Sequence, residues 1–273
     1  DLGSQALREW LSRLTRPDFE PLPRLVLAEL QAEGSGGFGS LPIHRNLLLS
    51  QLDELLRLEP DLLNNGEFVN VYISKLAPSA DENWQVDPVA KQAYLDRLEA
   101  FTSRLSPVHN SLKACVLYQR LIFDRTQGAR DKNRFMAYIQ LPRNVAYISR
   151  DFMKKPENQN FAADLGQSYC GLPSITDDQE LVRDYLEHFF VTEESHKPYI
   201  EFLDEDYLKR VFAETKILHG IGDLEKWAAW LTPGDFQQLK ERVGIEFDPA
   251  NRERYGVGDP AKVTVWTKNV GTL

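Results

Sequence analysis

Cys170 is the side chain in this sequence best suited to covalent chemistry. It lies in the stretch Gly166–Ser174, GQSYCGLPS, where glycines on both sides would let a substrate approach the thiol. A catalytic thiol needs a base, usually histidine, and surroundings that lower its pKa. Five histidines are available, but no family signature surrounds Cys170. We expect a packed loop cysteine and keep a thiol-dependent enzyme as an alternative.

Possible metal ligands are densest near the end of the helix expected over 176–191. His188 and His196 are eight residues apart, whereas two ligands on one helical face are usually four residues apart. The acidic run Glu201–Asp206 precedes a helix, and the helix dipole alone favours acidic side chains there. We therefore expect solvated helix ends, with no metal and no cofactor. The carboxylates beside the two histidines are Glu187, Glu193 and Glu194.

Basic side chains gather around the turn at Gly128 and continue downstream of it. A cluster of arginines can bind phosphate or carboxylate groups. Arg120 and Asp124, four residues apart, also fit a simple ion pair on a helix surface, and charge runs are usually solvated faces. We treat the cluster as a candidate site for an anion or a protein partner. Its members are Arg120, Arg125, Arg130, Arg134 and Arg143.

Trp227 and Trp230 are spaced to lie on one face of a helix, with Phe236 nearby. Large aromatic side chains are frequent in the central part of protein interfaces. The same spacing is also typical of a helix that packs into a core. The two tryptophans are therefore candidates for a partner-binding groove, with core packing as the competing interpretation.

The stretch Gly34–Ser40, GSGGFGS, fits the pattern G-x-G-x-x-G. A dinucleotide-binding loop needs a strand before these glycines, a helix directly after them and an acidic residue further on. The sequence around this stretch does not supply that combination. We therefore expect a flexible linker.

The stretch Ser111–Leu141 organises the rest of the chain, because it predicts two helices joined by a turn. Gly128 ends the first helix, Asp131 caps the second and Pro142 stops it. The first helix is apolar almost all round, which is typical of a helix with neighbours on most sides. Its apolar members are Leu112, Ala114, Cys115, Val116, Leu117, Tyr118, Leu121, Ile122 and Phe123.

The remaining apolar periodicity predicts further helices and very little strand. The expected helices cover 4–14, 24–32, 41–58, 67–76, 87–105, 176–191, 204–219, 223–231 and 232–243. Asp87, Thr176 and Thr232 are the expected caps of the helices that follow them. No residues recur at fixed offsets, so the fold class is mainly α, as an irregular multi-helix bundle or a degenerate helical solenoid.

The last residues predict the start of a β domain. We expect a strand over Lys262–Lys268, a turn at Asn269–Gly271 and then a returning strand. A lone hairpin is not stable in water, so we expect a longer polypeptide that continues into a β-rich domain. The expected division is 1–33 (short helices), 34–40 (linker), 41–250 (all-α domain), 251–261 (linker) and 262–273 (first strands).

Composition narrows the class of protein. The chain has 273 residues, of which 42% are hydrophobic and 27% charged, with a net charge of −9. An acidic chain argues against non-specific binding to nucleic acid or to anionic membranes. No run of about 18 apolar residues is present, and two cysteines make no disulfide framework. The chain starts at Asp1 rather than Met, which fits a mature exported chain or a trimmed one.

These observations favour a non-catalytic helical interaction or scaffold domain from a larger multidomain protein. Its partner would be a protein, including the rest of its own chain, and we expect no nucleic acid. Two alternatives remain open. The first is a thiol-dependent enzyme that uses Cys170, and the second is a structural subunit of a large assembly.

Overall fold

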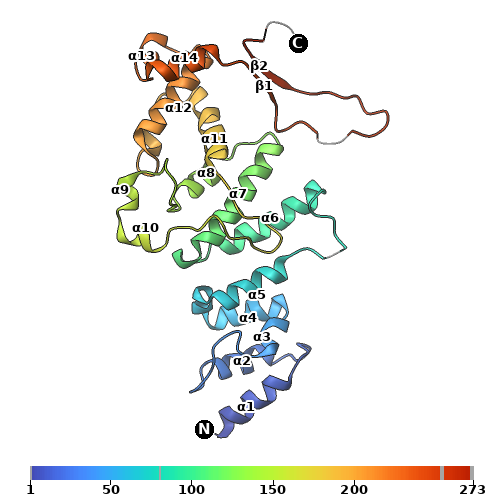
Figure 1. Ribbon diagram of the computed structural model, residues 1–273. Helices are drawn as coiled ribbons and strands as arrows, with labels where there is room; N and C mark the ends of the chain where they lie inside the picture. The colour runs from blue at the N-terminus through green and yellow to red at the C-terminus, as the bar shows by residue number, and fades with distance from the viewer. Residues whose placement is uncertain (1, 80, 253–254, 271–273) are drawn as a thin grey trace. The chain divides into compact units, whose positions relative to one another are not determined.

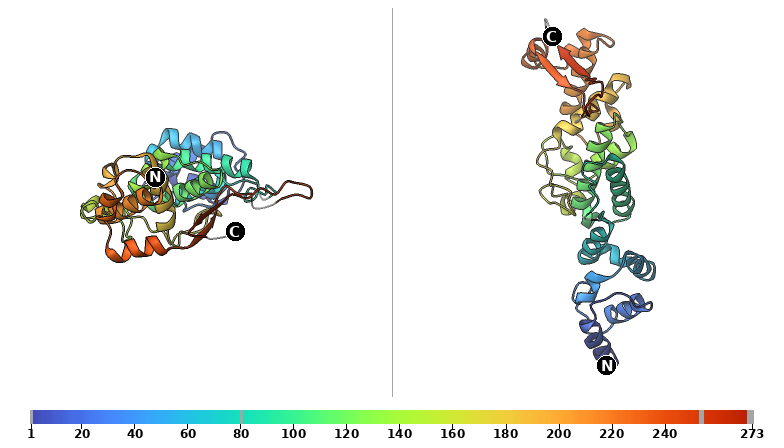
Figure 2. Two further views of the ribbon diagram at one scale, coloured as in Figure 1. Left: turned by 90° about the horizontal axis from the view of Figure 1, so that it is seen from above. Right: turned by 90° about the vertical axis from the view of Figure 1, so that its right-hand side faces the viewer.

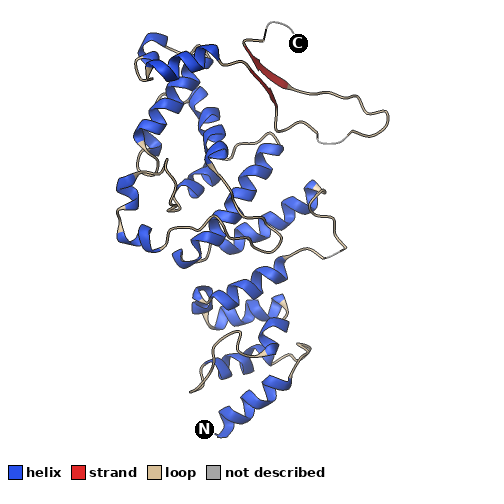
Figure 3. Ribbon diagram, viewed as in Figure 1, coloured by secondary structure: helices blue, strands red, loops and turns tan. Residues whose placement is uncertain are grey.

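The computed structural model describes residues 2–79, 81–252 and 255–270. Helices dominate this part of the chain, and the two strands it contains both lie after residue 243 (Figure 3). The expected mainly-α fold class is therefore confirmed. No helix among the described residues combines the length and the apolar character that a membrane crossing requires.

The chain forms two compact units. Unit 1 comprises the residues up to Val116 together with Tyr169–Leu172, and unit 2 comprises Leu117–Ser168 and Pro173–Leu273. Helix α7 (Asn110–Thr126) contributes residues to both units. The five-part domain division expected from the sequence stays a prediction.

Unit 1 is built from short helices that follow one another along the chain (Figure 1). Their bounds are α1 (Leu2–Arg13), α2 (Leu22–Leu30), α3 (Pro42–Asn46), α4 (Leu49–Leu58), a 3₁₀ turn (Pro60–Asn64), α5 (Gly66–Leu76), α6 (Pro88–Thr102) and a second 3₁₀ turn (Pro107–His109). Fully buried side chains of this core include Leu22, Val26, Leu52, Phe68, Tyr94 and Leu95. The helix expected over 67–76 is confirmed as α5, and the side chain of Asn65 accepts a hydrogen bond from the Phe68 N–H at its start.

The single helix expected over 41–58 is wrong, because the chain is extended at Leu47 and Leu48. The Gln51 side chain accepts a hydrogen bond from the Leu48 N–H at 3.0 Å and so helps to start α4. With this extended backbone, the Leu47 side chain packs in the core and is fully buried, while Leu48 is 50% exposed. Neither glycine nor proline stands at this break, and the apolar residues keep helical spacing across it. The sequence therefore carries no local signal for the break.

The glycine-rich stretch 34–40 is a packed loop in the structure, and its role as a linker between domains stays a prediction. Phe38 is only 5% exposed, and its ring stacks on the imidazole of His44 with 4.8 Å between centroids. The Gly39 N–H donates to Nδ1 of His44 at 2.9 Å. Gly39 has φ +96°, which favours glycine at this position. Aromatic burial and one histidine acceptor thus hold the loop in place.

Helix α7 is buried along most of its length, as its sequence predicts. In unit 1, Leu112, Ala114 and Val116 are at most 2% exposed. In unit 2, Leu121 is fully buried and Phe123 is 5% exposed. Each half of the helix therefore contributes to the core of its own unit.

Unit 2 contains the remaining helices and most of the polar networks described below. Its helices after α7 are α8 (Lys132–Ile139), α9 (Arg150–Met153), α10 (Pro156–Asn160), α11 (Gln179–Thr192), a 3₁₀ turn (Lys197–Tyr199), α12 (Glu205–Leu218), α13 (Leu224–Ala228) and α14 (Pro233–Glu241). The expected caps Asp131 and Thr232 are confirmed, because each side chain accepts a backbone N–H of the first helical turn. Helix α11 packs along α12, and α13 follows at the end of α12 (Figure 1).

The expected cap Thr176 is wrong, since α11 begins at Gln179 and Asp178 occupies the N-cap position. The Asp178 side chain makes no capping hydrogen bond. Its carboxylate instead accepts the Tyr138 hydroxyl. A tertiary contact has therefore replaced the local one.

The two strands pair with each other in an antiparallel sheet and lie side by side (Figure 2). Strand β1 (Gly244–Phe247) pairs with β2 (Val265–Lys268), so that Gly244 lies opposite Lys268. The strand expected over 262–268 is thus present but shorter, and its partner lies upstream. That partner falls in the segment assigned to the all-α domain. The expected returning strand at 271–273 lies outside the described residues.

Candidate functional site

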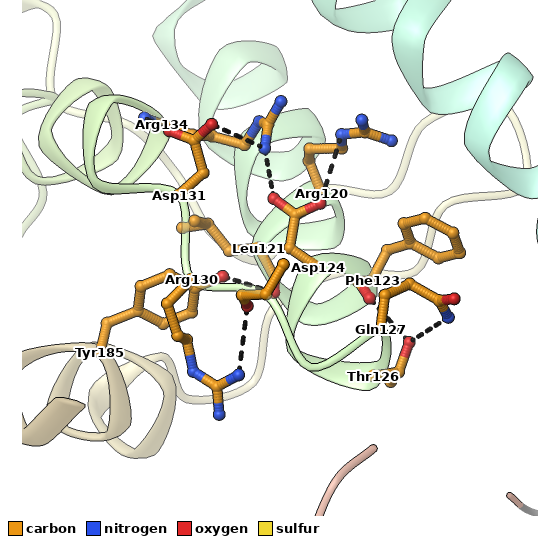
Figure 4. Close-up of polar contacts among 11 residues, drawn as sticks. Arg120, Leu121, Phe123, Asp124, Thr126, Gln127, Arg130, Asp131, Arg134 and Tyr185 are labelled. Carbon is orange, nitrogen blue, oxygen red and sulfur yellow. Dashed lines mark hydrogen bonds and ion pairs between the residues drawn. The ribbon is translucent and has the colours of Figure 1, made fainter. Parts of the chain in front are cut away.

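The carboxylate of Asp124 joins α7 to α8 through two arginines (Figure 4). Its Oδ1 lies 3.7 Å from Nε of Arg120, and its Oδ2 contacts the guanidinium of Arg134. All three side chains are at most 15% exposed. Burial raises the pKa of Asp124, and the two arginines oppose that rise. Two of the candidate arginines, Arg120 and Arg134, therefore form ion pairs with a buried carboxylate of the same unit.

Arg130 and Arg125 pair with carboxylates of α11. Nε and one Nη of Arg130 donate to the two carboxylate oxygens of Asp184 at 2.8 and 3.3 Å. The guanidinium carbon of Arg130 also lies 5.4 Å from the centre of the Tyr185 ring. Arg125 lies 3.6 Å from Glu180. These contacts join the end of α7 and the turn after it to α11.

Arg143 is fully buried and pairs with Asp178, at 3.1 Å between Nε and Oδ2. The Tyr138 hydroxyl donates to the same carboxylate at 2.7 Å. Arg143 also donates to the carbonyl oxygens of Tyr138 and Leu141. All five candidate arginines thus lie within 4.0 Å of a carboxylate. The sequence offered the Arg120–Asp124 pair, which the structure contains, but it did not predict the acidic partners of the other arginines.

The two candidate tryptophans differ in exposure. The Trp227 ring packs against Phe212, and its Nε1–H donates to the Ile221 carbonyl at 2.9 Å. The Trp230 ring lies 5.1 Å from that of Trp227, nearly perpendicular to it, and is 38% exposed. Trp227 therefore belongs to the core of unit 2, whereas Trp230 offers an accessible aromatic surface.

Trp230 lies on the wall of a groove formed by α12, the start of α14 and the segment Ala146–Tyr147. The Asp204 N–H donates to the Tyr147 carbonyl at 2.9 Å, which holds this segment against the start of α12. The side chain of Asp204 caps α12, and Thr232 caps α14. The side chains that line this groove, here called the α12–α14 groove, include Tyr147, Asp204, Tyr207, Arg210, Trp230 and Asp235.

The groove combines aromatic, basic and acidic side chains. Tyr207 is 7% exposed, and burial raises the pKa of its hydroxyl while the charges of Arg183 and Arg210 oppose the rise. The guanidinium carbon of Arg210 lies 5.9 Å from the Tyr207 ring centre. Tryptophan, tyrosine and arginine are the residues most enriched at the energetic centres of protein interfaces. Sequence reasoning found Trp230 but missed Tyr207 and Arg210, because only the tertiary fold brings them to one groove.

Cys170 lies in unit 1 and has the character of a packed residue. Its carbonyl accepts the Tyr94 hydroxyl at 2.9 Å, and its φ is +45°. Burial raises the pKa of its thiol, which is opposite to the shift that activates a nucleophile. This geometry gives no support to a thiol-dependent enzyme.

The expected groups of acidic and histidine side chains do not form a metal site in the described part of the chain. No set of three or more histidine, cysteine or carboxylate side chains there is arranged to hold an ion. His196 is buried, and its ring instead packs edge-to-face against Trp230 with 5.6 Å between centroids. In the run Glu201–Asp206, Asp204 caps α12.

Comparison with known proteins gives one family and one characterised relative. A family model described as the actin-binding protein F N-terminal domain matches residues 1–243. Actin-binding protein F of Dictyostelium discoideum is 32% identical over 259 residues, which cover 92% of this chain. The chain spans 11% of the length of that relative. No solved structure matches the chain.

Proposed function

Because this chain belongs to the family of the actin-binding protein F N-terminal domain, we propose that it is a non-catalytic protein-binding domain whose partner is actin. The family match carries this proposal, since it covers residues 1–243 and so includes every helix of both units. Actin is proposed as the partner because the relative from Dictyostelium discoideum is named an actin-binding protein. The related protein is far longer than this chain, which supports the further proposal that the domain acts as one module of a multidomain scaffold.

We place the contact with actin at the α12–α14 groove. Trp230 supplies an exposed aromatic ring, and Tyr207 and Arg210 lie beside it in the same groove. A protein interface needs such anchors in a recess that a partner can fill. Trp227 supports Trp230 from the core side through a perpendicular ring contact, so its proposed role is to position the anchor.

The five arginines of the α7–α8 region have a supporting role in this proposal. Each pairs with a carboxylate of the same unit, so the cluster holds little unbalanced positive charge for a partner. Arg130 and Arg125 reach α11, and α11 packs on α12, which carries one wall of the groove. The arginines would thus keep the groove in shape.

Co-sedimentation of the purified chain with actin filaments tests the proposal. We expect saturable pelleting with filaments and none without them. The control is a polypeptide of similar charge and size that does not bind actin. It shows whether charge or size alone causes pelleting, although the net charge of −9 disfavours non-specific binding to acidic surfaces. Pelleting no greater than that of the control would contradict actin as the partner.

A further inference from the structure

Two hydrogen-bond donors of α12 residues that line the groove lack an acceptor in the described part of the chain. They are the hydroxyl of Tyr207 and Nε of Arg210, and both atoms are buried. A buried donor without an acceptor is unfavourable, and folded proteins keep few of them. A ligand that supplies an acceptor at this place would satisfy both donors.

The charges of the groove indicate the chemistry of that acceptor. Arg210 has no carboxylate within 4.0 Å among the described residues, whereas its neighbour Lys209 pairs with Glu205 at 2.9 Å. The groove carboxylates of Asp204 and Asp235 already accept the Tyr207 N–H and the Thr232 hydroxyl. Asp206, the third groove carboxylate, is exposed. Arg210 is thus a cation that no ion pair of the described chain offsets.

We propose that Arg210 and Tyr207 bind the carboxylate of an aspartate or glutamate side chain presented by the protein partner, with the Trp230 indole covering its methylene groups. This proposal rests on the proposed function for the position of the interface. A guanidinium and a phenol both donate to carboxylate oxygens, and charge-assisted hydrogen bonds of this kind are about twice as strong as neutral ones. The raised pKa of Tyr207 keeps its hydroxyl protonated, and so able to donate, at neutral pH.

Adjacent residues of α12 provide a matched pair of variants. Arg210→Met and Lys209→Met each remove one positive charge from the groove. We expect Arg210→Met to weaken actin binding by at least about tenfold and Lys209→Met by less than about threefold. Tyr207→Phe removes only the hydroxyl, and we expect it to weaken binding by about fivefold. Circular dichroism and the denaturation midpoint confirm that each variant is folded.

A peptide experiment separates this proposal from the proposed function. Hexaglutamate, with both ends blocked, is added to the full chain while the Nε–H signals of Arg210 and Trp230 are followed by NMR, and hexaglutamine is the neutral control. We expect hexaglutamate alone to shift both signals, and Arg210→Met to abolish the Trp230 shift. Identical spectra with the two peptides would overturn carboxylate recognition, whatever actin does. A hexaglutamate shift in a chain that does not bind actin would retain the carboxylate site and refute the proposed function.

Discussion

Nε of Arg143 lies 3.1 Å from Oδ2 of Asp178, and both side chains are at most 1% exposed. Arg143 follows α8, and Asp178 stands at the start of α11. The pair therefore joins two segments that are far apart in the sequence, close to where Tyr147 and Gln179 line the α12–α14 groove.

Removing one member of this pair is expected to destabilise unit 2 strongly. Arg143→Met leaves the buried carboxylate of Asp178 without its cation, and loss of one partner from a buried ion pair costs about 3 to 5 kcal/mol. Denaturant unfolding of the variant and the wild type measures the difference. The double variant Arg143→Met/Asp178→Leu is the control, because it removes both charges and should recover part of the loss. A single variant as stable as the wild type would contradict this account.

The carboxylate of Asp124 contacts two arginines, whereas that of Asp131 is exposed and contacts one of them at 3.7 Å. Replacement of Asp124 by Asn keeps the shape and removes the charge that Arg120 and Arg134 share. We expect Asp124→Asn to lower the free energy of unfolding by about 2 to 3 kcal/mol. Asp131→Asn keeps a side-chain acceptor for the α8 cap, so it should change that free energy by less than about 1 kcal/mol. If Asp124→Asn and Asp131→Asn lowered the free energy of unfolding equally, the buried ion pairs of Asp124 would contribute no more to stability than the exposed pair of Asp131.

His44 makes the stability of unit 1 sensitive to acid. Burial lowers the pKa of its imidazole from 6.5 to about 4, so the unfolded chain binds a proton more readily than the folded one. The neutral His44 therefore contributes its full stabilisation above pH about 6.5, and this contribution to the free energy of unfolding decreases as the pH falls toward 4. Lowering the pH from 7 to 5 should therefore reduce the free energy of unfolding by about 2 kcal/mol through His44. Unfolding of wild type and His44→Gln at both pH values measures this, because glutamine keeps an acceptor for Gly39 but does not titrate. The same pH dependence in both proteins would refute the role of His44.

The thiols are expected to react slowly in the folded chain. Burial raises the pKa of Cys115 to about 12 and also raises that of Cys170. Labelling with a thiol-disulfide reagent at neutral pH should be at least about tenfold slower in the native protein than in denaturant. Rapid native labelling of Cys170, traced by peptide mapping, would revive the enzyme alternative.

Local signals in the sequence were sufficient for most helices and their caps. Asp87, Asp131 and Thr232 cap the helices that follow them, because the acceptor and the N–H it binds are only a few residues apart. The same reasoning failed for Thr176, since the start of α11 depends on how the fold uses Asp178. The break at Leu47 and Leu48 was missed for a similar reason, as only tertiary packing distinguishes these two leucines.

The candidate site was predicted less completely than the fold. Spacing alone placed Trp227 and Trp230 together, but it could not tell which ring is buried against Phe212 and which is exposed. The arginines were found as a group because their charges are visible in the sequence. Their carboxylate partners on α11 were not predicted, since those contacts join residues that are distant along the chain.

The central claim, that the groove around Trp230 contacts actin, is tested most directly by comparing two exposed tryptophans. Trp230 is 38% exposed in unit 2, and Trp10 is 43% exposed in unit 1. Each ring also packs against other aromatic rings, so circular dichroism must first show that both alanine variants are folded. We predict that Trp230→Ala raises the dissociation constant for actin filaments by at least about tenfold, as expected for an interface anchor. Trp10→Ala should leave it within about twofold. Equal binding by Trp230→Ala and the wild type would contradict the account.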